Sequence, residues 1–448
     1  MADRFPGWCI HSLAKPSWLE SIPLIRSLPF LFLLLPLALP AFCGDRLPGL
    51  DAYNKGDYQE ALRAWRPLAT QGNPEAQYRL GLLFANGQGL PRDPELAYRW
   101  FLKAAEMGHA PSQFLVGRAL LGGDGVDKNP AAAAKWLQRA ADRNHAPAQY
   151  LLGMMKLQGY GIDRNPEQAV TLIEQAASQG HAPAAYALGM MYLEGQGLPR
   201  DQDKAAQWLE KAARKGDLQA IYELGRLTRK DDEKTWLGAM RAAAQGGYAP
   251  AQYDLGSAYM TGALGLTADP ETGLSWLKKA ATQHYPRAEF DLGWAYETGT
   301  GTARDLKAAI HWYQEAARHG YARAQYQLGL LYQEGRGVKK DETRALQLQE
   351  QAAQAGFADA QYALGVMYDL GSGTQQDFGK AMQWYLKAAA QNHPMAMYAI
   401  GNLYANGYGV TKDLKTARTW YCKAAHLGLP QALRILDNPK DLDQACPP

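Results

Sequence analysis

Hydrophobic and polar positions recur along this chain with a long, regular period. A short phrase, most often an aromatic residue, any residue, Leu and Gly, occurs ten times between Tyr78 and Gly401. Most steps from one phrase glycine to the next are 36 residues long. Such a period is typical of stacked repeats that each bury a face against the next repeat. The phrase glycines are Gly81, Gly117, Gly153, Gly189, Gly225, Gly256, Gly293, Gly329, Gly365 and Gly401.

The pattern predicts two helices in each repeat, which we call helix A and helix B. In the repeat that starts at His145, helix A runs to about Gln158 and ends at Gly159, because glycine readily takes the left-handed conformation that closes a helix. Helix B ends after an Ala-Ala pair at a Gly, Asn or His. We therefore predict an all-α fold, an α-solenoid (superhelix) of ten two-helix repeats of about 36 residues.

Every helix B is preceded by an Asp or Asn, whose side-chain oxygen accepts hydrogen bonds from the free amides of the first turn. These predicted caps are Asp93, Asn129, Asn165, Asp201, Asp232, Asp269, Asp305, Asp341, Asp377 and Asp413. Tryptophan recurs at one helix B position, and we expect it to fill the space that the phrase glycines leave between the helices. The tryptophans are Trp100, Trp136, Trp208, Trp276, Trp312, Trp384 and Trp420.

One repeat, around residues 219–247, is shorter than the others. Only 7 residues separate Gly225 from Asp232, against 12 from Gly81 to Asp93. Its Trp236 also stands three positions ahead of the usual tryptophan position. We expect a kink or a change of curvature here, in the middle of the array.

The ends of the chain depart from the period. Ser27 to Gly44 is an uncharged, mostly apolar stretch after Arg26, with small residues at Ala41 and Cys43, as in a secretory signal peptide. We predict a cleaved signal and an exported protein, periplasmic or secreted; the alternatives are a retained anchor and a start codon further downstream. The predicted divisions are a signal peptide over 1–43, a capping helix pair over 44–72, the array over 73–428, and a C-terminal cap and tail over 429–448.

Charge and cysteine content narrow the choice of partners. The chain has 47 basic and 44 acidic residues, a balance that gives no electrostatic reason to expect nucleic acid. Its four cysteines have no metal-ligand spacing, and we predict no cofactor and no metal. After signal cleavage Cys422 and Cys446 remain, and an even pair in an oxidising compartment predicts a disulfide. The alternative is that Cys422 is a buried free thiol.

Several histidines and one serine are the candidates for catalytic or metal-binding groups. His109, His145, His181 and His393 share a repeat position with Tyr248, Tyr285, Tyr321 and Phe357, an exchange that indicates packing at a turn. His311, His319 and His426 each lie singly, which predicts no metal site. Ser275 and Lys278 match the Ser-x-x-Lys pattern of penicillin-recognising enzymes but lie inside helix B, around Trp276. We predict no catalytic residue.

The repeat itself resembles a known family. Residues 321–356 show most of the pattern Ala-x-aromatic-x-Leu-Gly, a Gly-x-Gly turn, an Asp cap and a final Ala-Ala pair, with Leu348 in place of Trp. This is similar to the Sel-1-like repeat, a branch of the tetratricopeptide-like helical repeats, and the resemblance covers about residues 51–436. It implies a non-catalytic scaffold of the bacterial cell envelope that binds a partner protein or peptide. The cysteine-rich members of the family carry a disulfide in each repeat, and this chain lacks those cysteines.

By analogy with tetratricopeptide arrays, helix A should line a concave binding face. Two positions, directly after the phrase glycine and three residues further, vary from repeat to repeat and are therefore free to specify a ligand. The candidate groove residues are Met154, Leu157, Met190, Leu193, Arg226, Arg229, Trp294 and Glu297. Their alternative role is packing between neighbouring A helices. The alternative functions are a glycan- or peptidoglycan-binding envelope protein and, third, a β-lactam or peptidoglycan-modifying enzyme.

Overall fold

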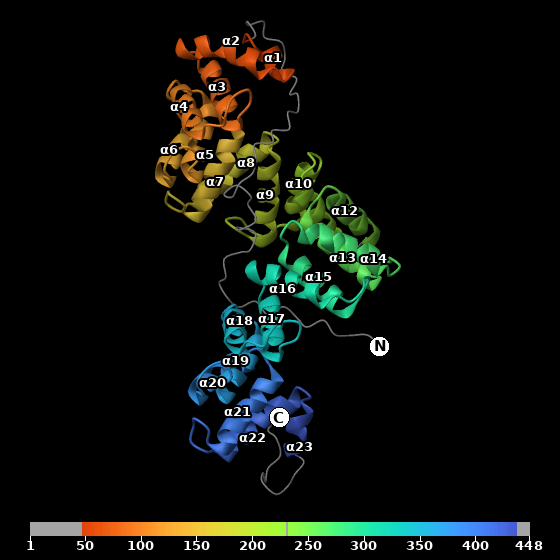
Figure 1. The fold of residues 1–448 in the computed structure, drawn as a ribbon. Coiled ribbons are helices and arrows are strands. Elements are labelled where there is room, and N and C mark those ends of the chain that lie inside the picture. Colours follow the sequence, from red (N-terminus) through yellow and green to blue (C-terminus); the bar gives the residue numbers. More distant parts are fainter. Residues whose placement is uncertain (1–46, 230–231, 437–448) are drawn as a thin grey trace. The chain divides into compact units, whose positions relative to one another are not determined.

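The structure is a computed structural model that describes residues 47–229 and 232–436. Within these residues the chain forms helices joined by turns, and successive helices pack as pairs (Figure 1). This confirms the predicted all-α solenoid. The helices group into two compact units, Met1–Ala220 and Ile221–Pro448. The division falls in the predicted short repeat.

The two helices of each repeat lie where the periodic pattern predicts them. The A helices are α3 (Pro74–Asn86), α5 (Ala110–Gly122), α7 (Ala146–Gln158), α9 (Ala182–Glu194), α11 (Leu218–Thr228), α13 (Ala249–Thr261), α15 (Pro286–Thr298), α17 (Ala322–Glu334), α19 (Ala358–Leu370) and α21 (Pro394–Asn406). The B helices are α4 (Pro94–Glu106), α6 (Pro130–Ala141), α8 (Pro166–Ser178), α10 (Gln202–Ala213), α12 (Glu233–Gln245), α14 (Pro270–Ala281), α16 (Leu306–Arg318), α18 (Glu342–Gln354), α20 (Phe378–Ala389) and α22 (Leu414–His426). Three further helices flank them: α1 (Leu50–Asn54) and α2 (Tyr58–Thr70) before, and α23 (Pro430–Leu436) after.

Local chemistry sets the helix ends as predicted. At each of the ten cap positions the Asp or Asn side chain accepts a hydrogen bond from a first-turn amide, as Asp93 does from the amide of Leu96 at 2.9 Å. Helix B is followed by a residue with positive φ, including Asn144 (57°) and Asn392 (62°) where glycine is absent. Both features depend on the backbone around one residue, which is why sequence alone locates them.

The phrase glycines do bring helices A and B together, but the residue that they receive is not the predicted tryptophan. A Cβ added at Gly153 would lie 2.7 Å from Ile173, and one at Gly401 would lie 2.4 Å from Tyr421. In the regular repeats the residue packed against the glycine is the one directly after the tryptophan position, and it is buried. These residues are Phe101, Leu137, Ile173, Leu209, Leu277, Tyr313, Gln349, Tyr385 and Tyr421.

The tryptophans themselves are only half-buried, which corrects the expectation that they fill the core. Six of the seven carry a Lys or Arg, three residues further along helix B, over the indole ring. Lys211 lies 3.6 Å from the ring centroid of Trp208 in this arrangement. Trp312 has Glu315 at the equivalent place. The tryptophan position is therefore a cation–π position at the edge of the core.

The short repeat packs differently. Trp236, in α12, is 2% exposed, and its ring lies 5.3 Å from that of Tyr222 in α11. A Cβ at Gly225 would meet Trp236 and Ala239. In this repeat the usual tryptophan position holds the small residue Ala239. The displaced Trp236 therefore fills the space next to Gly225.

Candidate functional site

The predicted groove residues differ in how far they are buried. Met154 and Leu157 in α7 are 6% and 8% exposed. They belong to the packed interior, so the prediction that they line a binding groove is wrong. Helix A is surrounded on most sides in a stacked array, and a position that varies between repeats can still be buried.

The remaining apolar pair and the two arginines are more accessible. Met190 and Leu193 in α9 are half-buried, and Arg226 in α11 and Arg229 in the turn after it are exposed. Arg226 is held by Glu223, one turn earlier, with an Nη1–Oε2 distance of 2.9 Å. Whether these residues bind a partner stays a prediction.

Trp294 and Glu297 lie together in a surface depression of about 550 Å³. Three successive A helices, α15, α17 and α19, contribute to it, together with the turns that precede or follow them. Its other lining residues are Phe290, Thr298, Arg304, Arg323, Tyr326, Gln327, Phe357 and Asp359. Trp294 and Glu297 are neighbours because they lie one turn apart on α15, and residues of α17 and α19 complete the depression. Whether it binds a partner stays a prediction.

The depression has an exposed aromatic wall and a buried floor. The side chain of Trp294 is 46% exposed, whereas Phe290, one helical turn earlier on α15, is 6% exposed. The guanidinium of Arg323 lies 5.1 Å from the ring centroid of Phe290. An aromatic ring and an arginine next to each other are the residue types that most often anchor protein interfaces.

Glu297 is part of the floor and already has partners. Its Oε2 accepts a 2.6 Å hydrogen bond from the Tyr313 hydroxyl, and its Oε1 lies 2.7 Å from Nη2 of Arg336. Gln327 adds a longer contact of 3.4 Å. Burial and the adjacent carboxylate raise the pKa of Tyr313, which therefore stays a hydrogen-bond donor. Glu297 thus joins two adjacent repeats and does not offer a free charge to a ligand.

The charged rim of the depression was missed in the sequence analysis. Arg323 and Asp359 occupy the same place in successive repeats, near the start of helix A, and both are exposed. The Asp359 carboxylate lies 3.2 Å from Nε2 of His393, and this hydrogen bond lowers the pKa of Asp359. Their position varies between repeats, so the rule that selected Trp294 would have selected them too.

The four histidines that share a repeat position with aromatics pack as predicted. Each ring contacts the aromatic residue of the preceding helix A, at centroid distances from 4.9 Å for His393 to 5.3 Å for His181. Tyr285 and Phe357 make the same contact at 5.4 Å. Burial and a neighbouring histidine lower the pKa of His145 and of His181 to about 4, so both rings are neutral at pH 7.

The expectation that His319 lies singly is wrong. Nδ1 of His319 lies 2.8 Å from Oε2 of Glu289, and Nδ1 of His284 lies 3.7 Å from Oε1 of the same carboxylate. His284 and His319 are 35 positions apart in the sequence and belong to successive repeats. They meet because the ends of helices B in adjacent repeats lie side by side.

Two further residues considered from the sequence are Ser275 and Cys422, and the structure describes the surroundings of both. The Ser275 hydroxyl donates a 2.8 Å hydrogen bond to the backbone carbonyl of Thr272 on its own helix, α14. Cys422 is 2% exposed and disulfide-bonded. Its predicted partner Cys446 lies outside the described residues, so this pairing stays a prediction.

These features define a class of protein: an all-helical repeat array whose accessible features are side-chain surfaces on successive A helices. The Sel1 repeat family matches residues 74–109, 110–145, 146–181, 182–217, 249–285, 286–321, 322–357, 358–393 and 394–429. The chain belongs to this family. The unmatched stretch between 217 and 249 is the short repeat, which the structure nevertheless forms as α11 and α12.

One solved structure supports the same assignment. The chain is similar to c5321, described as a protective antigen of uropathogenic Escherichia coli strains with an SLR fold. The identity is 32%, covering 83% of this chain and 80% of that one, with a TM-score of 0.58. It is also similar to a Sel1 repeat protein from Oxalobacter formigenes, with 32% identity over 52% of this chain and 94% of that one and a TM-score of 0.49. No curated protein sequence matches the chain significantly.

Sel1 repeat proteins are generally scaffolds for protein–protein interaction, and the family is not a catalytic one. Among the helices in the described part of the chain, none has the length and apolar character needed to cross a bilayer. The predicted signal segment, residues 1–43, lies outside the described residues.

Proposed function

We propose that this chain is a non-catalytic adaptor that binds a peptide segment of a partner protein in the depression lined by α15, α17 and α19. The observation that carries the proposal is the exposed ring of Trp294 in the same hollow as Arg323, to which three consecutive A helices contribute. Arginine and tryptophan contribute strongly to binding free energy when a partner covers them.

The charges of the rim favour a particular kind of segment. Arg323 and Arg304 offer positive charge, and Asp359 lies on the same rim. A segment with one large apolar side chain for Trp294 and a carboxylate near it for the arginines fits this distribution. The peptide would lie across successive A helices, as peptides do in other helical-repeat grooves.

The proposal includes export, with the array working in the periplasm or outside the cell. The support is the pattern of residues 1–43, with an apolar core between Arg26 and the small residues Ala41 and Cys43. Expression in a Gram-negative host and N-terminal sequencing of the soluble protein test it. A mature protein that still contains Arg26 contradicts this part of the proposal.

Glycan binding is the weaker alternative. A sugar ring stacks on an open aromatic face, and in six of the seven repeated tryptophans a Lys or Arg already lies over the ring. Trp294 is not among these six, so glycan binding would depend on the ring of Trp294. Muropeptides therefore belong in the test as competing ligands.

A displayed library of random peptides, selected against the full chain, tests the proposal. Selected peptides should share an apolar residue next to an acidic one, and Trp294→Ala should weaken their binding at least tenfold without changing the melting temperature. Leu370→Ala is the matched control, because Leu370 is 71% exposed and does not line the depression. Equal affinity for wild type and Trp294→Ala, or binding of muropeptides alone, would overturn the proposal.

A further inference from the structure

Three residues that can ligate a metal ion meet at one place in the second unit, and two of them depart from the repeat pattern. At the position of Glu289 six other repeats have glutamine: Gln77, Gln113, Gln149, Gln252, Gln325 and Gln361. At the position of His284 the other repeats have Gly or Asn, as the positive φ of this turn favours. His319 stands at a position that varies between repeats and holds Gln283 and Gln391 in two of them.

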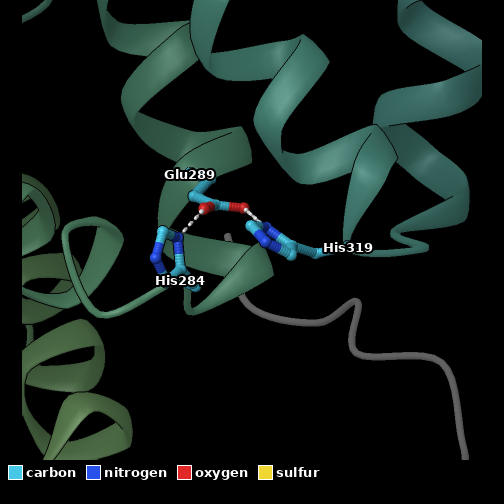
Figure 2. A group of neighbouring side chains, drawn as sticks. All are labelled: His284, Glu289 and His319. Atoms are coloured by element: carbon cyan, nitrogen blue, oxygen red, sulfur yellow. Dashed lines mark hydrogen bonds and ion pairs between the residues drawn. The ribbon is translucent and has the colours of Figure 1, made fainter.

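Figure 2 shows how the three side chains converge from different elements. His284 lies in the turn before α15, Glu289 in the first turn of α15, and His319 at the end of α16. The Glu289 side chain is fully buried, whereas those of His284 and His319 are 72% and 33% exposed. The centroids of the two imidazole rings lie 5.0 Å apart, and each ring presents a nitrogen to one oxygen of the carboxylate.

The glutamines at this position show what the repeat normally does there. Gln252 donates from Nε2 to the carbonyl of Ala244 at 3.0 Å and accepts from Gln283 at 2.8 Å. Gln361 makes the same two bonds with Ala353 and Gln391, at 3.2 and 2.9 Å. All six glutamines donate from Nε2 to such a carbonyl at the end of a helix, although Oε1 of Gln77 and of Gln113 has no hydrogen-bond partner.

Glu289 cannot repeat that arrangement, because an ionised carboxylate has no donor. Its Oε2 takes the 2.8 Å hydrogen bond from His319, but its buried Oε1 makes no hydrogen bond. The nearest nitrogen to that oxygen is Nδ1 of His284, at 3.7 Å. A buried carboxylate oxygen without a partner is unfavourable unless a positive charge compensates it.

We propose that His284, Glu289 and His319 bind a divalent transition-metal ion, with Zn²⁺ as the reference ion. Two imidazole nitrogens and one carboxylate oxygen are ligands that suit zinc, and three protein ligands leave a fourth position for water or another group. One ligand atom from each residue lies within 4.8 Å of the other two. Around a tetrahedral zinc such atoms lie about 3.5 Å apart, so the exposed His284 ring needs to move by only about an ångström.

Simple ion pairs elsewhere in the chain differ from this group. His109 with Glu75 and His393 with Asp359 are pairs in which the histidine also stacks on an aromatic ring. Among the residues that the structure describes, the group of His284, Glu289 and His319 is the one that offers three such ligands. The ion would join the repeat of residues 249–285 to that of residues 286–321 and stabilise their contact.

The test is calorimetric titration of the full chain, without an affinity tag, with zinc chloride. The double substitution Glu289→Gln and His319→Gln recreates the pairing of Gln252 with Gln283 and is therefore expected to fold. Wild type should gain one zinc site that this double variant lacks, with at least a hundredfold loss of affinity. His284→Gly, which restores the usual residue of this turn, should weaken zinc binding at least tenfold.

His311→Ala is the matched control, because His311 is an exposed histidine of α16 outside the group. It should bind zinc as wild type does. Zinc should also raise the melting temperature of wild type and of His311→Ala but not of the double variant, and cobalt(II) should give the visible spectrum of a tetrahedral site in the same two proteins. Equal zinc binding by wild type and the double variant, or no saturable site in wild type, would overturn the proposal and leave an ion pair only.

Discussion

Gly365 and Tyr385 are in such close contact that a methyl group at Gly365 would lie 2.5 Å from the tyrosine ring. Tyr385 is 1% exposed and contacts the glycine from the facing helix, so the ring has no free space to move into. The same relation recurs between the phrase glycine and a buried helix B residue in the other regular repeats. It defines how closely helices A and B approach.

Gly365→Ala should therefore destabilise the second unit, by about 1–3 kcal/mol, the usual range for overpacking. The measurement is denaturant unfolding followed by circular dichroism. Gly238→Ala is the control, because Gly238 lies on an exposed part of α12 with no atom near the added methyl group. There the better helix propensity of alanine should stabilise the protein by up to about 1 kcal/mol. Equal effects at both glycines would contradict the packing argument.

Removing the Glu297 carboxylate should also destabilise the second unit. Glu297→Ala leaves the buried Tyr313 hydroxyl and the Arg336 guanidinium without their acceptor, a loss of about 1–3 kcal/mol. Tyr313→Phe should cost less, because Arg336 and Gln327 still pair with the carboxylate. Thermal melts of the two single variants and the double variant separate these contributions. If the loss of stability in the double variant equals the sum of the two single losses, the two residues act independently.

Two histidines make the first unit sensitive to acid. Burial lowers the pKa of His145 and His181 from 6.5 to about 4, so between these values the unfolded chain binds protons that the folded chain does not. Stability should therefore be full above about pH 6.5 and fall as the pH drops towards 4. Melting temperatures measured across this range test the sign.

The chain offers its own replacements for these histidines. His181→Tyr and His145→Phe introduce the residues that Tyr285 and Phe357 already place at the same repeat position, so the ring contacts should be kept. Both variants should lose part of the acid sensitivity while the melting temperature at pH 7 changes little. An unchanged pH profile in the double variant would assign the acid sensitivity to other groups.

The predicted bridge between Cys422 and Cys446 can be decided chemically. Closing this loop of about 24 residues should stabilise the end of the array by roughly 3 kcal/mol on the chain-entropy argument. Alkylation of the mature protein without reductant, followed by mass spectrometry, should leave both cysteines unmodified. Two alkylated cysteines would exclude the bridge, and Cys446→Ser should then have no effect on the melting temperature.

The amino-acid sequence by itself determined the repeat period, the helix boundaries and the packing role of the turn histidines. These features depend on requirements close to one residue. Gly159 is needed for its positive φ, Asp93 for an amide three residues away, and His181 occupies a turn where Tyr285 shows that an aromatic ring fits. Such requirements leave the same residue types at the same spacing, so a single chain displays them ten times.

The tertiary structure decided which side chains face solvent and which distant residues meet. Met154 and Trp294 occupy the same repeat position, yet one is buried and the other nearly half exposed, because the neighbours of each helix differ along the array. His284 and His319 meet although they belong to successive repeats. Burial and convergence of this kind depend on how whole helices pack, which the spacing of residues within one repeat does not specify.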